Sequence, residues 1–285
     1  MRLSQAPAVS VSIQLLYTHF QAEVLSSTQM VGTISQFAGI YREWAPDLAL
    51  REHVRCLWVN DLSKSQKEWL RVVPDGCADI FWTGSNLMVA GPDSQSIVDR
   101  LPLGAVIVGV RFKPGAASAW LGRPLGEIVD CRIPLAEVWQ RDTDRLLETV
   151  AGVRSTTSVA LALQAFLLNR LAEVGPADRQ IAFLRRAAGD NCLPAGIRVD
   201  RLAAQMGMSE RTLRRRCVDA FGYGFKTLDR VLRFQRFMRL AAHSSNGSLA
   251  DLAARSGYAD QAHMAREVHR MSSATAGELV AHLQT

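Results

Sequence analysis

The sequence predicts an α+β protein with a barrel-like or sandwich-like β-rich N-terminal domain, linker helices and an all-α C-terminal domain. Three observations support this fold class. Short apolar runs bounded by Pro and Gly fill the region from about residue 41 to 130. The same short helical unit occurs twice between residues 198 and 279. A segment with helical periodicity joins the copies, which makes them two helix-turn-helix units joined by a helix.

The length of 285 residues suits two domains with connecting segments. We expect an N-terminal tail at 1–36, a β-rich sensor domain at 37–140, a helical linker that could form a dimer surface at 141–175, and a DNA-binding domain at 176–285. Within the last domain, the two units occupy about 198–220 and 248–271, and the joining helix about 226–242. Gly175 and Pro176 mark the start of this domain.

The N-terminal region contains five apolar runs of strand length, separated by turn residues rather than helices. Such a pattern is typical of an antiparallel barrel or sandwich. The expected strands are 53–59, 69–73, 78–82, 87–90 and 105–112. Helices are expected at 116–121, 143–150, 159–172 and 177–188, the third with Leu161, Ala165, Leu168 and Ala172 on its apolar face.

Four residues of the β-rich region are candidates for an effector pocket. All six tryptophans lie before residue 140, and they either form core or line a cavity for a small molecule. Arg111 lies in an apolar strand and therefore needs a partner. That partner could be Asp75 or Asp79 in an internal salt bridge, or the carboxylate of an effector. The candidate pocket residues are Trp58, Asp75, Trp82 and Arg111.

The positive charge is confined to the C-terminal third. From residue 192 onward there are 14 Lys and Arg against 8 Asp and Glu, whereas the preceding residues carry 19 of each. The whole net charge of +6 therefore lies where the repeated unit is found. A basic domain of this kind is attracted to a phosphate backbone, so we expect double-stranded DNA as its partner.

Both copies of the unit place the same residue types at corresponding positions. Each has a small Ala on the first helix, a Gly that can end this helix in a left-handed conformation, an N-cap, and an apolar residue that points back at the first helix. These residues are Ala203, Gly207, Ser209 and Leu213 in the first copy, and Ala253, Gly257, Asp260 and Met264 in the second. An ordinary helical hairpin with a solvated basic face would explain one copy of the unit, but the presence of two copies favours DNA binding.

The joining segment reads as one amphipathic helix with two stripes. Its apolar stripe is Val231, Phe234, Met238 and Ala241, and its basic stripe is Arg230, Arg233, Arg236 and Arg239. A helix of this length could hold the two units about one DNA turn apart, so that one chain would contact two successive major grooves.

Four segments, 221–228 (FGYGFKTL), 233–236 (RFQR), 249–253 (LADLA) and 260–263 (DQAH), match one known pattern. They resemble the DNA-binding module of AraC-type transcriptional regulators, over about 90 residues. Segments 72–82 and 108–117 resemble a β-rich sensor domain that precedes some of these modules. The resemblance implies an activator or repressor of transcription, with double-stranded DNA, RNA polymerase and a small-molecule effector as partners.

The family pattern also assigns roles in DNA binding. Arg can bond guanine and Gln can bond adenine through two hydrogen bonds each, and a methyl group can contact thymine. The base-contacting positions are Arg211, Arg214 and Arg215 in the first unit, and Gln261, Ala262, His263 and Arg266 in the second. The phosphate-contacting positions are Ser209, Thr212, Arg216, Lys226 and Thr227.

The chain departs from the family pattern at five positions. Cys217 and Val268 replace aromatic residues, Phe225 and Ala276 replace prolines, and Ser273 replaces a glycine. Val268 makes the core of the second unit smaller, and Ser273 is expected to leave the turn after its second helix less defined.

The five cysteines are scattered, which suits a reducing cytoplasm, and no signal peptide or membrane-spanning run is apparent. We find no hydrolase elbow, metal motif or cofactor motif, so we expect no enzymatic activity and no cofactor. A cytoplasmic monomer or homodimer is expected. The alternative is a DNA-associated redox sensor or alkylation-repair-like protein. Cys56 and Cys77 are its candidate reactive thiols, although apolar strands make thiols inert.

Overall fold

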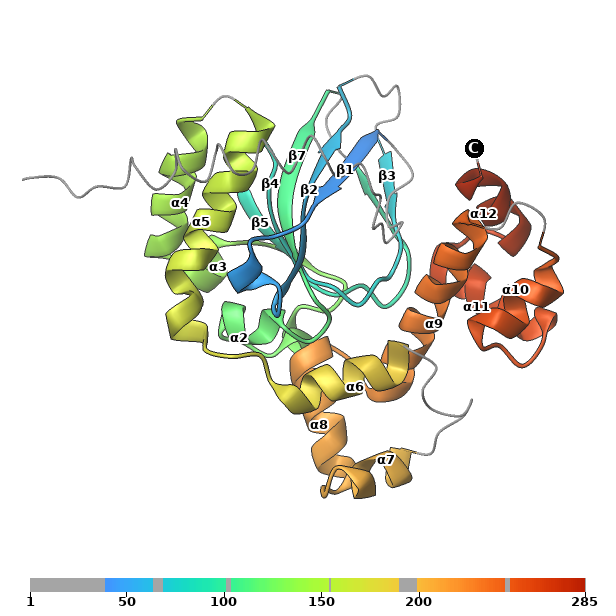
Figure 1. The fold of residues 1–285 in the computed structure, drawn as a ribbon. Helices are drawn as coiled ribbons and strands as arrows, with labels where there is room; N and C mark the ends of the chain where they lie inside the picture. Colours follow the sequence, from blue (N-terminus) through green and yellow to red (C-terminus); the bar gives the residue numbers. More distant parts are fainter. Residues whose placement is uncertain are drawn as a thin grey trace, which may run out of the picture.

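The computed structural model describes residues 39–63, 69–100, 104–153, 155–189, 199–243 and 247–284. The predicted N-terminal tail at 1–36 and Cys192 lie outside these ranges. Within the described ranges the protein has the mixed α+β fold that the sequence predicts: a β-rich N-terminal part followed by a helical C-terminal part (Figure 1).

The N-terminal part is built on a six-stranded antiparallel sheet and a separate two-stranded ribbon. The sheet has the order β1 (Ile40–Trp44), β2 (Val54–Asp61), β7 (Val106–Phe112), β4 (Asp79–Trp82), β5 (Leu87–Ala90) and β8 (Arg132–Pro134). The ribbon pairs β3 (Trp69–Val72) with β6 (Ile97–Arg100). The five predicted strands are confirmed, and β1, β6 and β8 are additional.

The two faces of the sheet have different environments because successive side chains point to opposite sides. On one face, Leu57, Val59, Ile80, Val108 and Val110 belong to the main apolar core. On the other face, Cys56, Trp58 and Ile107 form a smaller cluster against which Tyr41 and Phe81 pack.

Helices α4 (Arg141–Ala151) and α5 (Thr156–Val174) cover the first of these faces (Figure 1). Their buried side chains share one core with the sheet, so they do not stand apart as a separate linker. The predicted apolar face of α5 is only partly confirmed: Leu161 is buried and Leu168 packs against the core, but Ala172 is exposed. Ala160, Leu163 and Leu167 are buried as well. Residues 159–164 of α5 are all buried, because this part of the helix also packs against α4 and the short 3-10 helix Leu48–Leu50.

The other short helices of the N-terminal part are α2 (Ala117–Leu121), α3 (Ala136–Trp139) and the 3-10 helix η2 (Leu125–Glu127). The C-terminal helices are α6 (Arg179–Gly189), α7 (Val199–Gln205), α8 (Glu210–Phe221), α9 (Phe225–Ala242), α10 (Leu249–Ser256), α11 (Gln261–Ser272) and α12 (Ala276–Leu283). Helix α9 contacts α6, α8, α10, α11 and α12, so it is the central element of this part.

Loops of the N-terminal part pack directly into the C-terminal core. Val73, from the segment after β3, is buried in the same cluster as Phe221 and Tyr223. Gly115 lies so close to Ile181 and Phe221 that a Cβ there would be 2.4 Å from the Ile181 side chain. The two parts are therefore joined by close packing as well as by the chain.

Candidate nucleic-acid interface and effector cavity

The first unit, α7 and α8, has the local geometry that its sequence predicts. Gly207 adopts a left-handed φ of 66° after α7, and the amide of Met208 bonds the carbonyl of Ala203 over 3.0 Å. The Ser209 hydroxyl then accepts a 3.2 Å hydrogen bond from the amide of Thr212 and caps α8. Leu213 is fully buried, which fixes α8 against α7.

The second unit, α10 and α11, repeats this arrangement. Gly257 has a φ of 84°, and Asp260 caps α11 by accepting a 2.6 Å hydrogen bond from the amide of His263. Met264 is fully buried against the first helix. The ring of His263 packs edge-on against Tyr258, with 5.5 Å between the ring centroids, and this contact orients the side chain.

The turn after α11 is well defined, contrary to expectation. Ser273 takes the left-handed conformation that the family pattern reserves for glycine, with a φ of 55°, and its amide bonds the carbonyl of His269 over 2.8 Å. Thr275 and Glu278 then form a capping box that starts α12. Val268 is fully buried, so the smaller side chain still closes the core.

Six of the seven predicted base-contacting side chains are exposed on the second helices of the two units. The four arginines among them form no ion pair with any residue that the structure describes. The exposed residues are Arg211, Arg214 and Arg215 on α8, and Gln261, Ala262 and Arg266 on α11; His263 is half-buried. Figure 1 shows α7 and the adjacent end of α8 at the far side of the molecule from the sheet.

A hollow in the first unit brings two of the predicted contact types together. It has a volume of about 410 Å³ and lies between the start of α8 and the start of α9. Arg211 and Arg214 line it from α8, and Lys226 lines it from the first turn of α9. The hollow thus places predicted base-contacting and phosphate-contacting cations on one surface.

The other predicted phosphate contacts differ in their availability. Ser209 and Thr212 are within 3.0 Å of each other through their hydroxyls, and Thr227 accepts a 3.3 Å hydrogen bond from Arg230. Arg216 has partners within the protein. Its guanidinium bonds Asp178 over 2.6 Å and Gln180 over 2.5 Å, because its position on α8 faces the start of α6.

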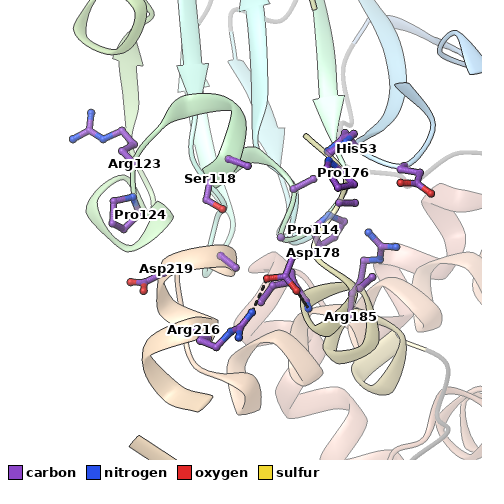
Figure 2. A pocket seen from close by; sticks show the side chains of 18 of the residues that line it. His53, Pro114, Ser118, Arg123, Pro124, Pro176, Asp178, Arg185, Arg216 and Asp219 are labelled. Atoms are coloured by element: carbon purple, nitrogen blue, oxygen red, sulfur yellow. Dashed lines mark hydrogen bonds and ion pairs between the residues drawn. The ribbon is translucent and has the colours of Figure 1, made fainter. Parts of the chain in front are cut away.

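Figure 2 shows this interaction at the edge of a cleft of about 490 Å³ between the two parts of the protein. Loop residues from the N-terminal part, including Pro114 and Ser118, lie on one side. Asp178 and Arg185 from the α6 segment and Arg216 from α8 lie on the other. Arg216 therefore links α8 to α6 beside the junction of the two parts.

The basic stripe of α9 is mostly used inside the domain. Arg236 donates to the carbonyls of Gly189 and Ser256, and so connects the ends of α6 and α10. Arg233 pairs with Asp229 and lies over the ring of Tyr258. Of the four arginines, only Arg239 is exposed. The apolar stripe is fully buried, as predicted.

A second cavity, of about 320 Å³, lies between the sheet and the β3–β6 ribbon. Three of the four predicted pocket residues, Trp58, Asp75 and Arg111, line it. Trp82 does not: its neighbour Phe81 faces the cavity, so Trp82 lies on the opposite face of β4 and packs against the main core.

Arg111 forms internal ion pairs with Asp75 and Asp79, which was one of the two interpretations of the sequence. It bonds Asp79 through two nitrogens over 3.0 and 2.9 Å, and its third nitrogen lies 3.2 Å from Asp75. Burial raises the pKa of Asp79 above its usual value, although Arg111 opposes this shift. The guanidinium is therefore already held by carboxylates of the chain.

The thiols named as alternatives for chemistry are buried. Burial raises the pKa of both Cys56 and Cys77 well above the usual value, with nearby carboxylates adding to the shift. A thiol with a raised pKa holds its proton and is a poor nucleophile. The structure therefore gives no support to a reactive cysteine at either position.

Two family comparisons match separate parts of the chain. Residues 202–282 match a family described as a helix-turn-helix domain, and residues 42–134 match one described as a domain of unknown function, DUF6597. The chain thus has an AraC-type helix-turn-helix domain, which is a DNA-binding module, preceded by a DUF6597 domain. No curated protein matches the chain. None of the described helices is long and apolar enough to cross a membrane.

Solved structures of ToxT from Vibrio cholerae are similar to this chain at low identity. An apo variant is 13% identical, with 80% of this chain and 98% of that chain covered and a TM-score of 0.46. Wild-type ToxT bound to an unsaturated fatty acid is 11% identical, with 81% and 96% covered and a TM-score of 0.45.

Proposed function

We propose that this protein is a sequence-specific transcription regulator that contacts DNA through both helix-turn-helix units and responds to a small effector bound in its N-terminal domain. The observation that carries this proposal is the pair of exposed second helices, α8 and α11, on one domain. Each is capped and anchored in the same way, and each leaves Arg or Gln side chains free on its outer surface.

In this proposal α8 and α11 enter successive major grooves. Arg211, Arg214 and Arg215 contact bases from α8, and their lack of ion pairs with other described residues leaves their hydrogen-bond donors available. On α11 the base contacts come from Gln261, Ala262, His263 and Arg266. The Tyr258 contact limits His263 to few orientations, so it would contact one base edge.

Lys226 and Thr227 contact the phosphate backbone in this proposal, with Ser209 and Thr212 at the start of α8. The amide end of a helix favours a phosphate through its free N–H groups and the helix dipole. Lys226 is exposed in the first turn of α9 and borders the same hollow as Arg214. Arg216 is excluded from this set by its bonds to Asp178 and Gln180.

Effector control is supported by a short path from the N-terminal cavity to the joining helix. Asp75 lines the cavity, and the carbonyl of the preceding Pro74 accepts a hydrogen bond from Gln235 of α9. Tyr223, between α8 and α9, is buried beside the same turn, with its hydroxyl 3.6 Å from the position that a Cβ of Gly76 would take. A ligand that moves this turn would therefore act on α9.

Binding of the full chain to DNA from upstream of its own coding sequence tests the proposal. Fluorescence anisotropy is measured with an excess of random DNA and repeated at increasing salt. We expect saturable binding that resists the competitor, since sequence-specific complexes are typically about 10³-fold or more tighter than nonspecific ones. Binding that disappears with the competitor, and whose salt dependence is the same for both DNAs, would leave only charge attraction and contradict the proposal.

A further inference from the structure

We propose that the N-terminal cavity binds a small organic cation, an amine or amidine carried on an apolar or aromatic body. This inference rests on the proposed effector control, because it names the chemical class of ligand for the same cavity. It also replaces the carboxylate ligand that Arg111 suggested in the sequence.

The walls of the cavity are apolar and aromatic on the side of the sheet. Trp58, Phe81, Met88 and Ile107 line it there, while Val72 lines it from the ribbon. Trp58 lies flat over Gly109, its cross-strand partner on β7, where a Cβ would be 2.5 Å from the indole carbons. The glycine thus allows the indole ring to form part of the wall, and an aromatic face of this kind attracts cations.

The charged groups of the cavity carry an excess of negative charge. Four carboxylates and two guanidiniums line it: Asp75, Asp79, Asp93, Asp99, Arg111 and Arg132. Each guanidinium is shared by two of these four carboxylates. Arg111 contacts Asp79 and Asp75, while Arg132 bonds Asp93 over 3.0 and 2.9 Å and lies 3.6 Å from Asp99.

The groups directly behind this lining do not cancel the excess. Glu43 lies 3.9 Å from Arg111, and the pKa of Arg55 is affected by the nearby Cys77 and Asp75. One further carboxylate is thus matched by one further guanidinium. Burial raises the pKa of Glu43 and brings that of Asp93 to about 6. The guanidiniums beside these carboxylates therefore do not fully offset the cost of burying their negative charge.

Two buried polar atoms of the lining residues have no hydrogen-bond partner among the described residues. They are Oδ2 of Asp75, which has only its ion-pair contact with Arg111, and Nε1 of Trp58. Asp75 is 8% exposed and Trp58 is 4% exposed, so solvent offers little replacement. A bound ammonium would lie among the carboxylates that outnumber their guanidiniums and near the indole ring, beside the Arg111 guanidinium that already lies 5.8 Å from the ring centroid.

An anionic ligand fits these groups poorly. Both guanidiniums already bond carboxylates of the chain, so a ligand carboxylate would have to displace Asp79 or Asp93 and leave a buried charge unpaired. A cation needs no such displacement, because it adds to carboxylates that outnumber their partners.

Calorimetric titration of the full chain at pH 7.5 tests the inference with matched probes. The cations are phenethylamine, tryptamine and benzamidine; the isosteric acids are 3-phenylpropionate and indole-3-propionate, and 2-phenylethanol is the neutral probe. We expect at least one cation to bind saturably and to change the tryptophan fluorescence, and the matched acid to bind at least tenfold more weakly.

Two cavity variants and one control assign the site. Asp75→Asn keeps the oxygen that accepts the 2.8 Å hydrogen bond from the amide of Cys77, so the turn is retained while the charge is lost. We expect at least a tenfold weaker affinity for the cation. Asp99→Asn, whose side chain is 35% exposed and so tolerates change, should weaken it several-fold. Asp144→Asn on α4, across the sheet from the cavity, should have no effect.

Three results would overturn the inference: no binding of any cation to the folded protein, acids that bind as tightly as their matched amines, or unchanged amine affinity in both cavity variants. The operator-binding measurement is independent of these results. If an amine binds in the cavity and leaves DNA binding unchanged, the ligand class stands and effector control fails.

Discussion

The side-chain amide of Gln235 in α9 donates a 2.6 Å hydrogen bond to the backbone carbonyl of Pro74, 161 residues earlier in the chain. Both residues are buried. One of them lies on the helix that joins the two DNA-binding units, and the other directly precedes a residue of the N-terminal cavity. This bond connects the two functional regions of the protein by one short path.

Gln235→Met should weaken this connection while conserving the length of the side chain. The buried carbonyl of Pro74 loses its donor, so we expect the free energy of unfolding to fall by about 1–3 kcal/mol in urea titrations. The effect of a cavity ligand on DNA affinity should also decrease. Gln95→Met, at an exposed position of the N-terminal part, is the control. Unchanged stability together with unchanged ligand response would refute this role for the bond.

Arg215→Ala and Lys226→Ala should have different effects on DNA binding. Loss of a base contact at Arg215 should reduce operator affinity by roughly 1–3 kcal/mol and relax specificity at one base pair, whereas loss of Lys226 should weaken operator and random DNA alike. Arg216→Ala is a matched control on the same helix, because its guanidinium is bound to Asp178 and Gln180. It should leave discrimination between sequences intact. Equal losses on both DNAs for Arg215→Ala and Lys226→Ala would contradict these assignments.

Ser273→Gly should stabilise the protein. A residue with a side chain in the left-handed conformation costs about 1–2 kcal/mol, which glycine avoids, and the φ of 55° persists in the variant. The exposed 2.9 Å contact between the hydroxyls of Ser273 and Ser96 offsets part of the gain. We therefore expect a net increase of roughly 1 kcal/mol in the free energy of unfolding. Ser273→Ala keeps the strain and loses the contact, so a gain in that variant would show that strain is not the cause.

The stability of the protein should depend on pH through Asp93. Its pKa is about 6 in the folded state because burial outweighs the two hydrogen bonds from Arg132, against an ordinary value of 3.8. The folded state therefore holds a proton that the unfolded chain releases, and the contribution of Asp93 to stability falls as pH rises from about 4 to 6, by up to about 3 kcal/mol.

Asp93→Asn removes this titration and should flatten the dependence measured by urea unfolding between these pH values. Burial raises the pKa of Glu43 and Asp79 in the same direction, so part of the slope should remain. Asp144→Asn should keep the full slope, because this carboxylate is exposed on α4. An Asp93→Asn profile parallel to that of the natural protein would be inconsistent with the raised pKa.

The helical units were predictable because their signals are local. Gly207 and Gly257 end helices, Ser209 and Asp260 start the next ones, and each acts within one turn of its own position. Strands β1, β6 and β8 were not predictable in the same way. Their sequences, IYREW, IVDR and RIP, are short and mix charged with apolar residues, and their pairing depends on partners distant in the sequence.

The candidate sites likewise depended partly on local signals and partly on contacts between distant segments. Because side chains alternate along a strand, Phe81 and Trp82 of β4 had to lie on opposite faces of the sheet. Which of the two faces the cavity became known only from the folded sheet. The ion pair of Arg216 depends on Asp178 and Gln180 at the start of α6, about which the local pattern of α8 carries no information. The shared use of Arg111 and Arg132 by four carboxylates likewise follows from the folded sheet and from no single segment.

The apolar cluster that runs from Val73 through α6 to Leu279 has a consequence for cooperativity. Both DNA-binding units and α9 contribute to this one core, so neither unit has a core of its own. We expect the helical part to unfold in a single transition. A fragment that ends before α10 would expose the apolar side of α9 and aggregate, and a substitution in one unit would lower the population of the folded form of the other.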